Sequence, residues 1–429
     1  AWLNRAATGM TTGGAVGVDG RVALQRGGWS LTGATLDLAG ARATGSMSYE
    51  ANGAGRGRFA ASLDATRLNF DELASLSGLV RQPEVTGALV SSDISLRLSA
   101  RELSIRGIDG KALSIEAALA GDDLKITSLS AADFAGARIE ASGSIDNLST
   151  SPSGLITAEI DAGSLAGIVA LAEDLAPASP VTLQLMRAAD HLVPAQLAAR
   201  FEARATADGS DADLRISGKA AGAELELAAR FAGRTDAWRE GDVAASLRLK
   251  GPDAAVLARQ IGLDIDTEGS LDAGQIEARL NGRPSEGMAM SVLARAGDAR
   301  VDATGELQFV DGSQPRYATE VKTKVPDLAP IALLWGKVLP VLSGEIGADL
   351  TFELVGEGTS LTLDDLKGRF AGVNVAGRLA GNLQPGDASG LRRLTGALDF
   401  SALDLRALSE LLLGADQWLQ PEEGEVWPK

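Results

Sequence analysis

Apolar and polar residues alternate along most of this chain with a period of two. In residues 93–98, for example, Ile94, Leu96 and Leu98 alternate with polar side chains. Successive side chains of a strand point to opposite faces, so this alternation predicts antiparallel strands with one apolar and one solvated face. The same pattern recurs at 113–119, 124–126, 214–216, 225–231, 276–280, 321–325 and 346–354.

A second pattern interrupts the strands at five places, where a residue with a short polar side chain precedes apolar residues at plus one and plus four. The last copy, for example, has Asp404 followed by Leu405 and Leu408. A side-chain oxygen at such a position satisfies free N–H groups at a helix start, and the apolar spacing gives the helix one apolar face. The pattern therefore predicts short amphipathic helices after Asn69, Ser164, Asp253, Asp327 and Asp404.

The recurrence of these copies along 429 residues favours an array of repeats over separate compact domains. Each copy is expected to close one β-repeat unit, and the last residues are expected to start a further, truncated unit. The predicted units are 1–80, 81–176, 177–262, 263–339 and 340–414, followed by 415–429.

These elements predict a mainly β fold, an elongated, curled antiparallel β-sheet repeat array with about five short helices. About 370 residues remain outside the helices, and at roughly 12 residues per strand and turn they allow on the order of 30 strands. A sheet of that size must twist and curl. Its apolar face either forms a hydrophobic groove or is buried against a second sheet. Many apolar positions hold Ala, Gly or Val, which fill a sandwich interior poorly, and this favours the groove.

The residues expected to line the groove are apolar residues on the alternating strands, each of which could equally be ordinary core. They are Leu96, Leu98, Ile115, Ile126, Ile139, Leu214, Ile216, Leu225, Leu227, Leu247, Leu249, Ile276, Leu280, Leu350, Phe352 and Val375.

Composition and charge argue against nucleic acid as a partner and exclude several kinds of structural feature. The net charge is −17 and no run of Lys and Arg is interleaved with aromatics, which argues against nucleic acid. There is no Cys, so disulfides and thiolate metal ligands are excluded. The apolar runs are shorter than the roughly 20 residues of a membrane-spanning helix. Because the chain begins with Ala1, we expect it to be a piece of a longer protein, with any anchor outside it.

Candidate catalytic chemistry is sparse. The single histidine, His191, has no second His or Cys with which to form a usual zinc site, and no GxSxG motif accompanies it. Adjacent carboxylates occur at 122–123, 364–365 and 422–423, but neighbouring residues of a strand face opposite ways. Roles in turns or on the solvated face are therefore favoured over acid–base catalysis. We expect no catalytic residues, no metal and no cofactor, and we do not expect an enzyme.

Several stretches together resemble the AsmA-like family of Gram-negative envelope proteins and, more distantly, TamB and other bridge-like lipid-transfer proteins. The resemblance is carried by the strand, cap and helix copies ALDFSALDLRALSELLLG and SLDATRLNFDELASL, combined with glycine-punctuated β-runs such as LTGATLDLAGARATGSMSYE and FAGVNVAGRLAGNLQPG. It implies a periplasmic body of curled β-sheet with a hydrophobic groove, an inner-membrane anchor preceding this chain, and a role in moving phospholipid to the outer membrane or maintaining that membrane.

Two functions follow as expectations. The first is a lipid-transfer bridge that carries acyl chains of phospholipid or another acyl lipid along the groove, with membranes reached through segments outside this chain. The alternative is a structural scaffold or assembly factor whose exposed sheet edges pair with strands of envelope proteins during outer-membrane protein insertion. A β-rich enzyme would need a convergent polar cluster, which the sequence does not indicate.

Overall fold

The computed structural model describes residues 16–38, 41–51, 56–69, 92–105, 107–148, 151–175, 180–207, 209–263, 270–309, 315–334, 346–383 and 391–402. The chain divides into two compact units, Ala1–Ala220 and Ala221–Lys429, which are described in turn. The division into five repeat units stays a prediction.

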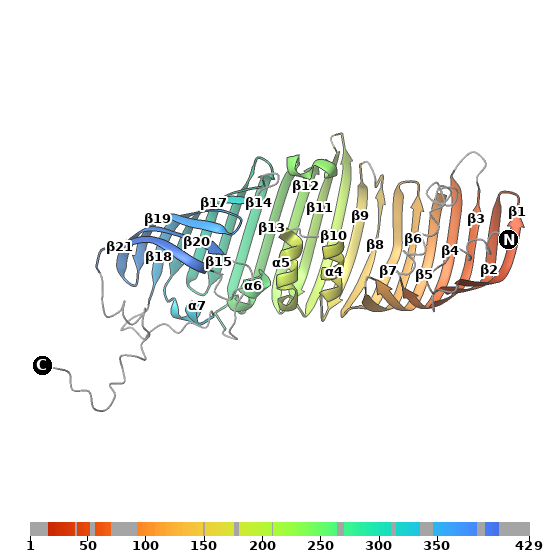
Figure 1. The fold of residues 1–429 in the computed structure, drawn as a ribbon, viewed down its shortest axis with the longest axis horizontal. Coiled ribbons are helices and arrows are strands. Elements are labelled where there is room, and N and C mark those ends of the chain that lie inside the picture. Colours follow the sequence, from red (N-terminus) through yellow and green to blue (C-terminus); the bar gives the residue numbers. More distant parts are fainter. Residues whose placement is uncertain are drawn as a thin grey trace, which may run out of the picture. The chain divides into compact units, whose positions relative to one another are not determined.

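The first unit is an open sheet whose strands follow one another in chain order (Figure 1). Neighbouring strands pair antiparallel, except that β4 and β5 pair parallel. The strands are β1 (Val16–Gln25), β2 (Gly28–Leu38), β3 (Ala41–Glu50), β4 (Gly57–Asn69), β5 (Ser92–Ile105), β6 (Ile108–Ala120), β7 (Asp123–Phe134), β8 (Ala137–Asp146), β9 (Ser153–Ala162), β10 (Ala195–Thr206) and β11 (Gly209–Ala220).

The second unit repeats this arrangement with antiparallel pairing throughout its described strands. Its strands are β12 (Ala223–Gly233), β13 (Asp242–Gly251), β14 (Gly274–Arg283), β15 (Gly287–Ala296), β16 (Ala299–Gln308), β17 (Arg316–Val325), β18 (Ala348–Glu357), β19 (Ser360–Phe370), β20 (Val373–Leu383) and β21 (Leu391–Phe400).

Short helices occupy the connections that follow β9, β13 and β17. They are α4 (Ala166–Leu175) and α5 (Pro180–Ala188) with the 3₁₀ turn η1 (Ala189–His191), then α6 (Ala254–Gln260) and α7 (Ala329–Leu334); a second 3₁₀ segment, η2 (Thr235–Glu240), precedes β13. Helix α5 was not expected from the sequence. No described helix combines the length and the apolar character that crossing a bilayer requires.

The predicted helix caps are confirmed where the structure describes them. The side chains of Ser164, Asp253 and Asp327 each accept a hydrogen bond from the backbone N–H two residues later, at 3.2, 2.8 and 3.0 Å. These bonds satisfy donors that have no partner within the helix. The helices predicted after Asn69 and Asp404 lie outside the described residues.

Within each unit the described strands that precede the predicted caps end at the same edge of the sheet. Strand β4 runs parallel to β5, and four antiparallel steps then make β9 parallel to both. Strands β13 and β17 likewise run in one direction. The margin of the sheet that runs across these strand ends, where β4 and β9 end and, in the second unit, where β13 and β17 end, is called the capped edge. It is formed by the ends of successive strands and is not an edge strand.

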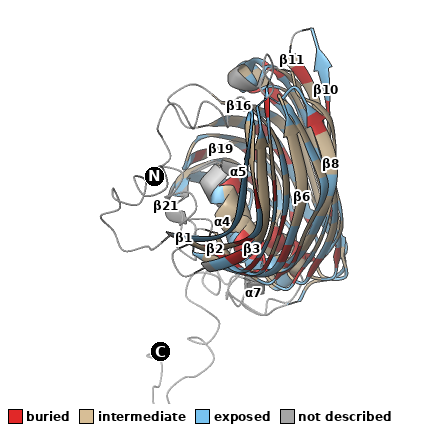
Figure 2. Ribbon diagram, turned by 90° about the vertical axis from the view of Figure 1, so that its right-hand side faces the viewer, coloured by how far each residue is buried: buried red, intermediate tan, exposed pale blue. Residues whose placement is uncertain are grey.

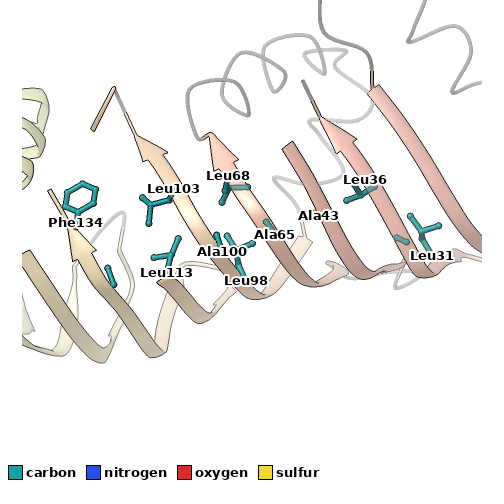
Figure 3. Close-up of a cluster of buried hydrophobic side chains, with 12 residues drawn as sticks. Leu31, Leu36, Ala43, Ala65, Leu68, Leu98, Ala100, Leu103, Leu113 and Phe134 are labelled. Carbon is teal, nitrogen blue, oxygen red and sulfur yellow. The ribbon is translucent and has the colours of Figure 1, made fainter. Parts of the chain in front are cut away.

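Most of the core of the first unit lies toward its capped edge, on one face of the sheet. Side chains from successive strands form this cluster, and Figure 3 shows them on the same side of the ribbon. They include Leu36 near the end of β2, Leu103 near the end of β5, Leu113 near the start of β6 and Phe134 at the end of β7. The strands bow, and helices α4 and α5 lie on the inner side of the curve (Figure 2).

The predicted fold class is confirmed: the protein is mainly β, built of antiparallel strands in an open, curled sheet with a few short helices. The described residues form 21 strands, each 10 to 14 residues long. The estimate of on the order of 30 strands was made for the whole chain and stays a prediction.

Candidate functional site

The predicted lining residues of the first unit all lie on the face that carries the core. Residues opposite each other in neighbouring strands share a face, so the register settles their placement. Leu98 faces Ile115, and Leu96 lies two residues from Leu98 on the same strand. The remaining pairs continue this face across the unit: Ile126 with Gly143, Ile139 with Ile160, Ile160 with Leu197, and Ile216 with Ala199. Leu214 lies opposite Phe201, two residues further along.

The second unit has the same organisation. Leu249 faces both Leu225 and Ile276, and Leu247 faces Leu227. Leu280 lies opposite Ala245 on that face. Further along, Leu350 and Phe352 face Thr323 and Val321 of β17, and Val375 faces Gly368. The structure therefore brings every predicted lining residue onto the apolar face of its unit. That they line a lipid path stays a prediction.

Burial divides this face into two zones. Leu98, Leu249, Ile276 and Val375 are buried, whereas the other predicted lining residues are only partly buried. An interior residue of a sandwich, covered by a second sheet, would be buried completely. The described part of each unit has a single layer of strands, so most of these side chains keep part of their surface accessible.

Described helices cover part of the buried zone at the capped edge. Leu165 and Ile168 of the α4 segment pack on Ala137, Ala162 and Ala195, a row of small residues at the strand ends. In the second unit, Leu257 of α6 packs on Leu249 and Ile276. The small side chains of the alanine row in the first unit let α4 approach the sheet closely. In the largest buried cluster of the first unit, which spans β2 to β7, Leu171 of α4 is the one residue of a described helix.

Glycines on the apolar face let neighbouring strands approach closely. Gly143 of β8 has φ 148°, and a Cβ added there would lie 2.0 Å from the carbonyl oxygen of Leu155. Gly218 of β11 has φ 151° and the same 2.0 Å approach to the carbonyl of Gln196. Glycines at such positions permit the bends that curve a sheet. They also leave gaps between the larger aliphatic side chains beside them.

The apolar face is not wholly aliphatic, because β17 brings hydroxyl groups onto it. Tyr317 donates to the backbone carbonyl of Ser360 at 3.4 Å, and burial raises the pKa of its phenol. Thr323 donates to the carbonyl of Leu350 at 3.5 Å. Thr319 lies between them and is 4% exposed, and among the described residues its hydroxyl has no hydrogen-bond partner.

Sequence reasoning missed several residues of this face. Ile156 and Phe201 lie opposite each other in its middle, although their own strands alternate clearly enough to have placed them. Trp29, Tyr49 and Phe59 form a row across β2, β3 and β4, with the Trp29 and Phe59 rings edge to face at 6.5 Å. This aromatic row depends on register and no local signal predicts it.

The opposite face is polar and rich in ion pairs. Arg97 contacts Glu116 at 2.7 Å, and Arg248 contacts Glu277 at 3.0 Å. A hollow of about 640 Å³ on this face of β8 to β11 is lined by residues including Arg138, Glu140 and Asp161. Arg138 donates to Glu140 at 2.6 Å, and this bond, helped by the charges of Glu140, Asp161 and Glu159, raises the pKa of the guanidinium.

The residues weighed for catalysis lie apart. His191 is exposed in η1. Asp364 pairs with Arg378 at 2.6 Å and Asp365 with Lys367 at 2.7 Å. Asp123 accepts from the backbone N–H at residue 147 at 3.0 Å. The pair at 422–423 lies outside the described residues. Within the described ranges, no group of three or more His, Asp or Glu side chains is placed to hold a metal ion.

No protein-family model, curated protein or solved structure matches this chain. Its function is therefore argued from its own geometry.

Proposed function

We propose that the apolar face binds acyl chains of phospholipid or another acyl lipid and lets them move across successive strands. The observation that carries this proposal is the partial burial of the middle of the face. Side chains such as Ile126, Leu214 and Phe352 share one face with their neighbours and keep accessible apolar surface. Contiguous accessible apolar surface is typical of sites that bind apolar ligands.

The free energies involved favour movement of an acyl chain along the apolar face over tight binding at one site. An acyl chain of roughly sixteen carbons loses on the order of 10 kcal/mol when it passes bare through water. Aliphatic side chains on adjacent strands, about 4.8 Å apart, offer many nearly equal contact positions. A chain leaving one position therefore reaches the next without crossing water, and no chemical step is needed. On this proposal the protein acts without a cofactor and is not an enzyme.

The cellular setting is proposed from the AsmA-like resemblance. It places the protein in the periplasm, attached to the inner membrane through a segment outside this chain, and gives it a part in carrying phospholipid between the inner and outer membranes. Net charge of −17 accords with the absence of nucleic acid among the proposed partners.

Substitutions at adjacent residues, which lie on opposite faces of the same strand, test this function on β11 and on β12. Ile216→Asp and Leu227→Asp each put a charge on the apolar face, whereas Ser217→Asp and Ala228→Asp put the same charge on the adjacent polar-face position. We expect the first pair to abolish binding of a fluorescent phospholipid and the second pair to retain it, with circular dichroism showing folded protein throughout. Equal binding by all the variants would exclude the apolar face as the lipid site. Unfolding confined to the first pair would make those residues core.

The alternative, a scaffold that pairs with client strands, is favoured by a different observation. Among the described strands, β1 pairs only with β2, and its apolar-face residues Val22 and Leu24 are 57% and 81% exposed. Phe400 of β21 is also exposed. Strands with one unpaired edge and exposed apolar side chains are typical sites of strand addition. Backbone-directed crosslinking from β1 to a barrel protein in envelope extracts, combined with lipid-free purified protein, would favour the scaffold.

A further inference from the structure

The polar face of the second unit carries a row of cations along its capped edge. Each cation lies one residue from the end of its strand, on strands that are neighbours or next neighbours. We define this basic row as Lys250 on β13, Arg295 on β15, Arg300 on β16, Lys324 on β17 and Arg369 on β19. All are exposed.

The register places like charges directly opposite one another. Arg300 lies opposite Arg295 on one side and opposite Lys324 on the other. Between Lys250 and Arg295 lies Gln275 of β14, which is opposite both and carries no charge. Between Lys324 and Arg369 lies Asp349 of β18, which is opposite both. Like charges in directly opposed positions of a sheet destabilise it. The row therefore carries a cost that a neutral or mixed row would avoid.

Acids lie opposite part of the row, Glu224 opposite Lys250 and Asp349 opposite Lys324 and Arg369, but Arg300 is the one member with an ion pair in the described ranges. Arg300 contacts Asp302 of its own strand, with Nη2 to Oδ1 at 2.7 Å. The pKa of Asp302 is lowered mainly by the hydrogen bond from Arg300, and the nearby positive charge of Arg295 lowers it further. Lys250, Arg295 and Lys324 form no ion pair with any residue in the described ranges. Much of the row is thus available to an external anion.

The first unit shows that the architecture does not require such a row. At the same positions of β8 to β11 stand Arg138, Asp161, Gln196 and Lys219. Arg138 lies opposite Asp161, an opposite charge, and Gln196 separates Asp161 from Lys219. Both units place long polar side chains here, but only the second places adjacent cations.

We propose that the basic row docks the second unit on a membrane surface that carries anionic phospholipid headgroups. The cations span β13 to β19, about 29 Å at about 4.8 Å per strand, in a line along a sheet edge. A line of flexible cationic side chains can meet the spaced phosphates of a lipid surface, and such residues each add about 1 kcal/mol of attraction. The overall charge of −17 would repel that surface, so local docking needs a concentrated basic site.

Sedimentation with vesicles tests the proposal. Wild-type protein is expected to bind vesicles of phosphatidylcholine mixed with phosphatidylglycerol, to ignore phosphatidylcholine alone, and to lose binding as salt screens the charges. The double variant Arg295→Gln/Lys324→Gln should bind the anionic vesicles about 25-fold more weakly, from about fivefold per cation. It leaves the Arg300–Asp302 pair in place.

A matched control removes the same net charge elsewhere. Lys125→Gln/Lys219→Gln neutralises exposed lysines on the polar face of the first unit and should change vesicle binding less than about twofold. Thermal unfolding should show that the basic-row variant is no less stable than wild type, since it removes opposed like charges.

Several outcomes would overturn the proposal. They are equal wild-type binding to both kinds of vesicle, equal losses in the two double variants, or unchanged binding in the basic-row variant. Binding to soluble poly-glutamate through Arg295 and Lys324, without binding to vesicles, would identify an acidic protein segment instead. Competition by inorganic phosphate at constant ionic strength would identify a site for the free anion. Acyl-lipid binding by the apolar face is measured separately, so its failure leaves this test intact.

Discussion

The capped edge and the middle of the apolar face use the same residue types and differ in what covers them. Leu249 and Ile276 are buried where α6 packs on them, whereas Ile126 and Ile216 occupy equivalent faces of their strands and remain partly accessible. Apolar character alone therefore does not separate core from binding surface. A residue contributes mainly to stability where it is buried, as Leu249 and Ile276 are under α6, and it is available to a ligand where its surface stays accessible.

Truncation of a leucine at the capped edge gives the largest expected effect. Leu257 of α6 is fully buried against Leu249 and Ile276, so Leu257→Ala should cost about 3 kcal/mol of unfolding free energy. Ile216→Ala, in the partly accessible middle, should cost about 1 kcal/mol, because less of its surface is removed from water in the folded state. Urea denaturation measures both. Equal costs would mean that the middle of the face is core, and the comparison would fail.

In the middle of the apolar face, we expect stability to depend more on how closely neighbouring backbones approach than on side-chain burial. Gly143→Ala introduces a Cβ that collides with the carbonyl of Leu155 at a φ that alanine rarely adopts, so we expect a loss of about 2 kcal/mol. Gly163→Ala is the matched control, because its added Cβ would meet only Gly136 at an ordinary 3.8 Å. Thermal unfolding measures both variants. A larger loss of stability in Gly163→Ala than in Gly143→Ala would show that close approach of the strands at Gly143 is not what stabilises this region.

The caps anchor the covered zone and give it a pH dependence. Burial raises the pKa of Asp253, but hydrogen bonds from the backbone N–H groups of Leu271 and Ala255 outweigh it, and the pKa is lowered overall. A lowered folded-state pKa means that this contribution is present above the unfolded pKa and is lost as pH falls through the folded one. Asp253→Ala should cost about 1 kcal/mol at neutral pH.

The pH profile provides the check on that assignment. The difference in unfolding free energy between wild type and Asp253→Ala should shrink in acid, and Asp253→Asn should show less of this pH dependence while keeping a capping oxygen. A difference that stays constant from neutral to acidic pH would show that the carboxylate charge has no part in the cap.

The parts of this structure that could be predicted from the sequence are those with local causes. Alternation assigned Leu96, Leu227 and Phe352 to the correct face because a strand has a period of two, and the caps at Asp253 and Asp327 follow from side chains close to the bonds they make. Which strands α4 covers, the parallel pairing of β4 with β5, and the opposed cations of the basic row depend on register between distant segments. No local pattern specifies that register.

The smallest expected effect concerns the hydroxyls of β17 and has opposite signs at two threonines of that strand, Thr319 and Thr323. The Thr319 hydroxyl is buried without a partner in the part of the chain that the structure describes, so the nearly isosteric Thr319→Val should stabilise the protein by up to about 1 kcal/mol. Thr323→Val removes a hydroxyl that donates to the Leu350 carbonyl and should destabilise by about 0.5 kcal/mol. Urea denaturation of both variants measures the difference. A destabilised Thr319→Val would mean that the hydroxyl has a partner in solution, and this part of the apolar face would then be wetter than its burial indicates.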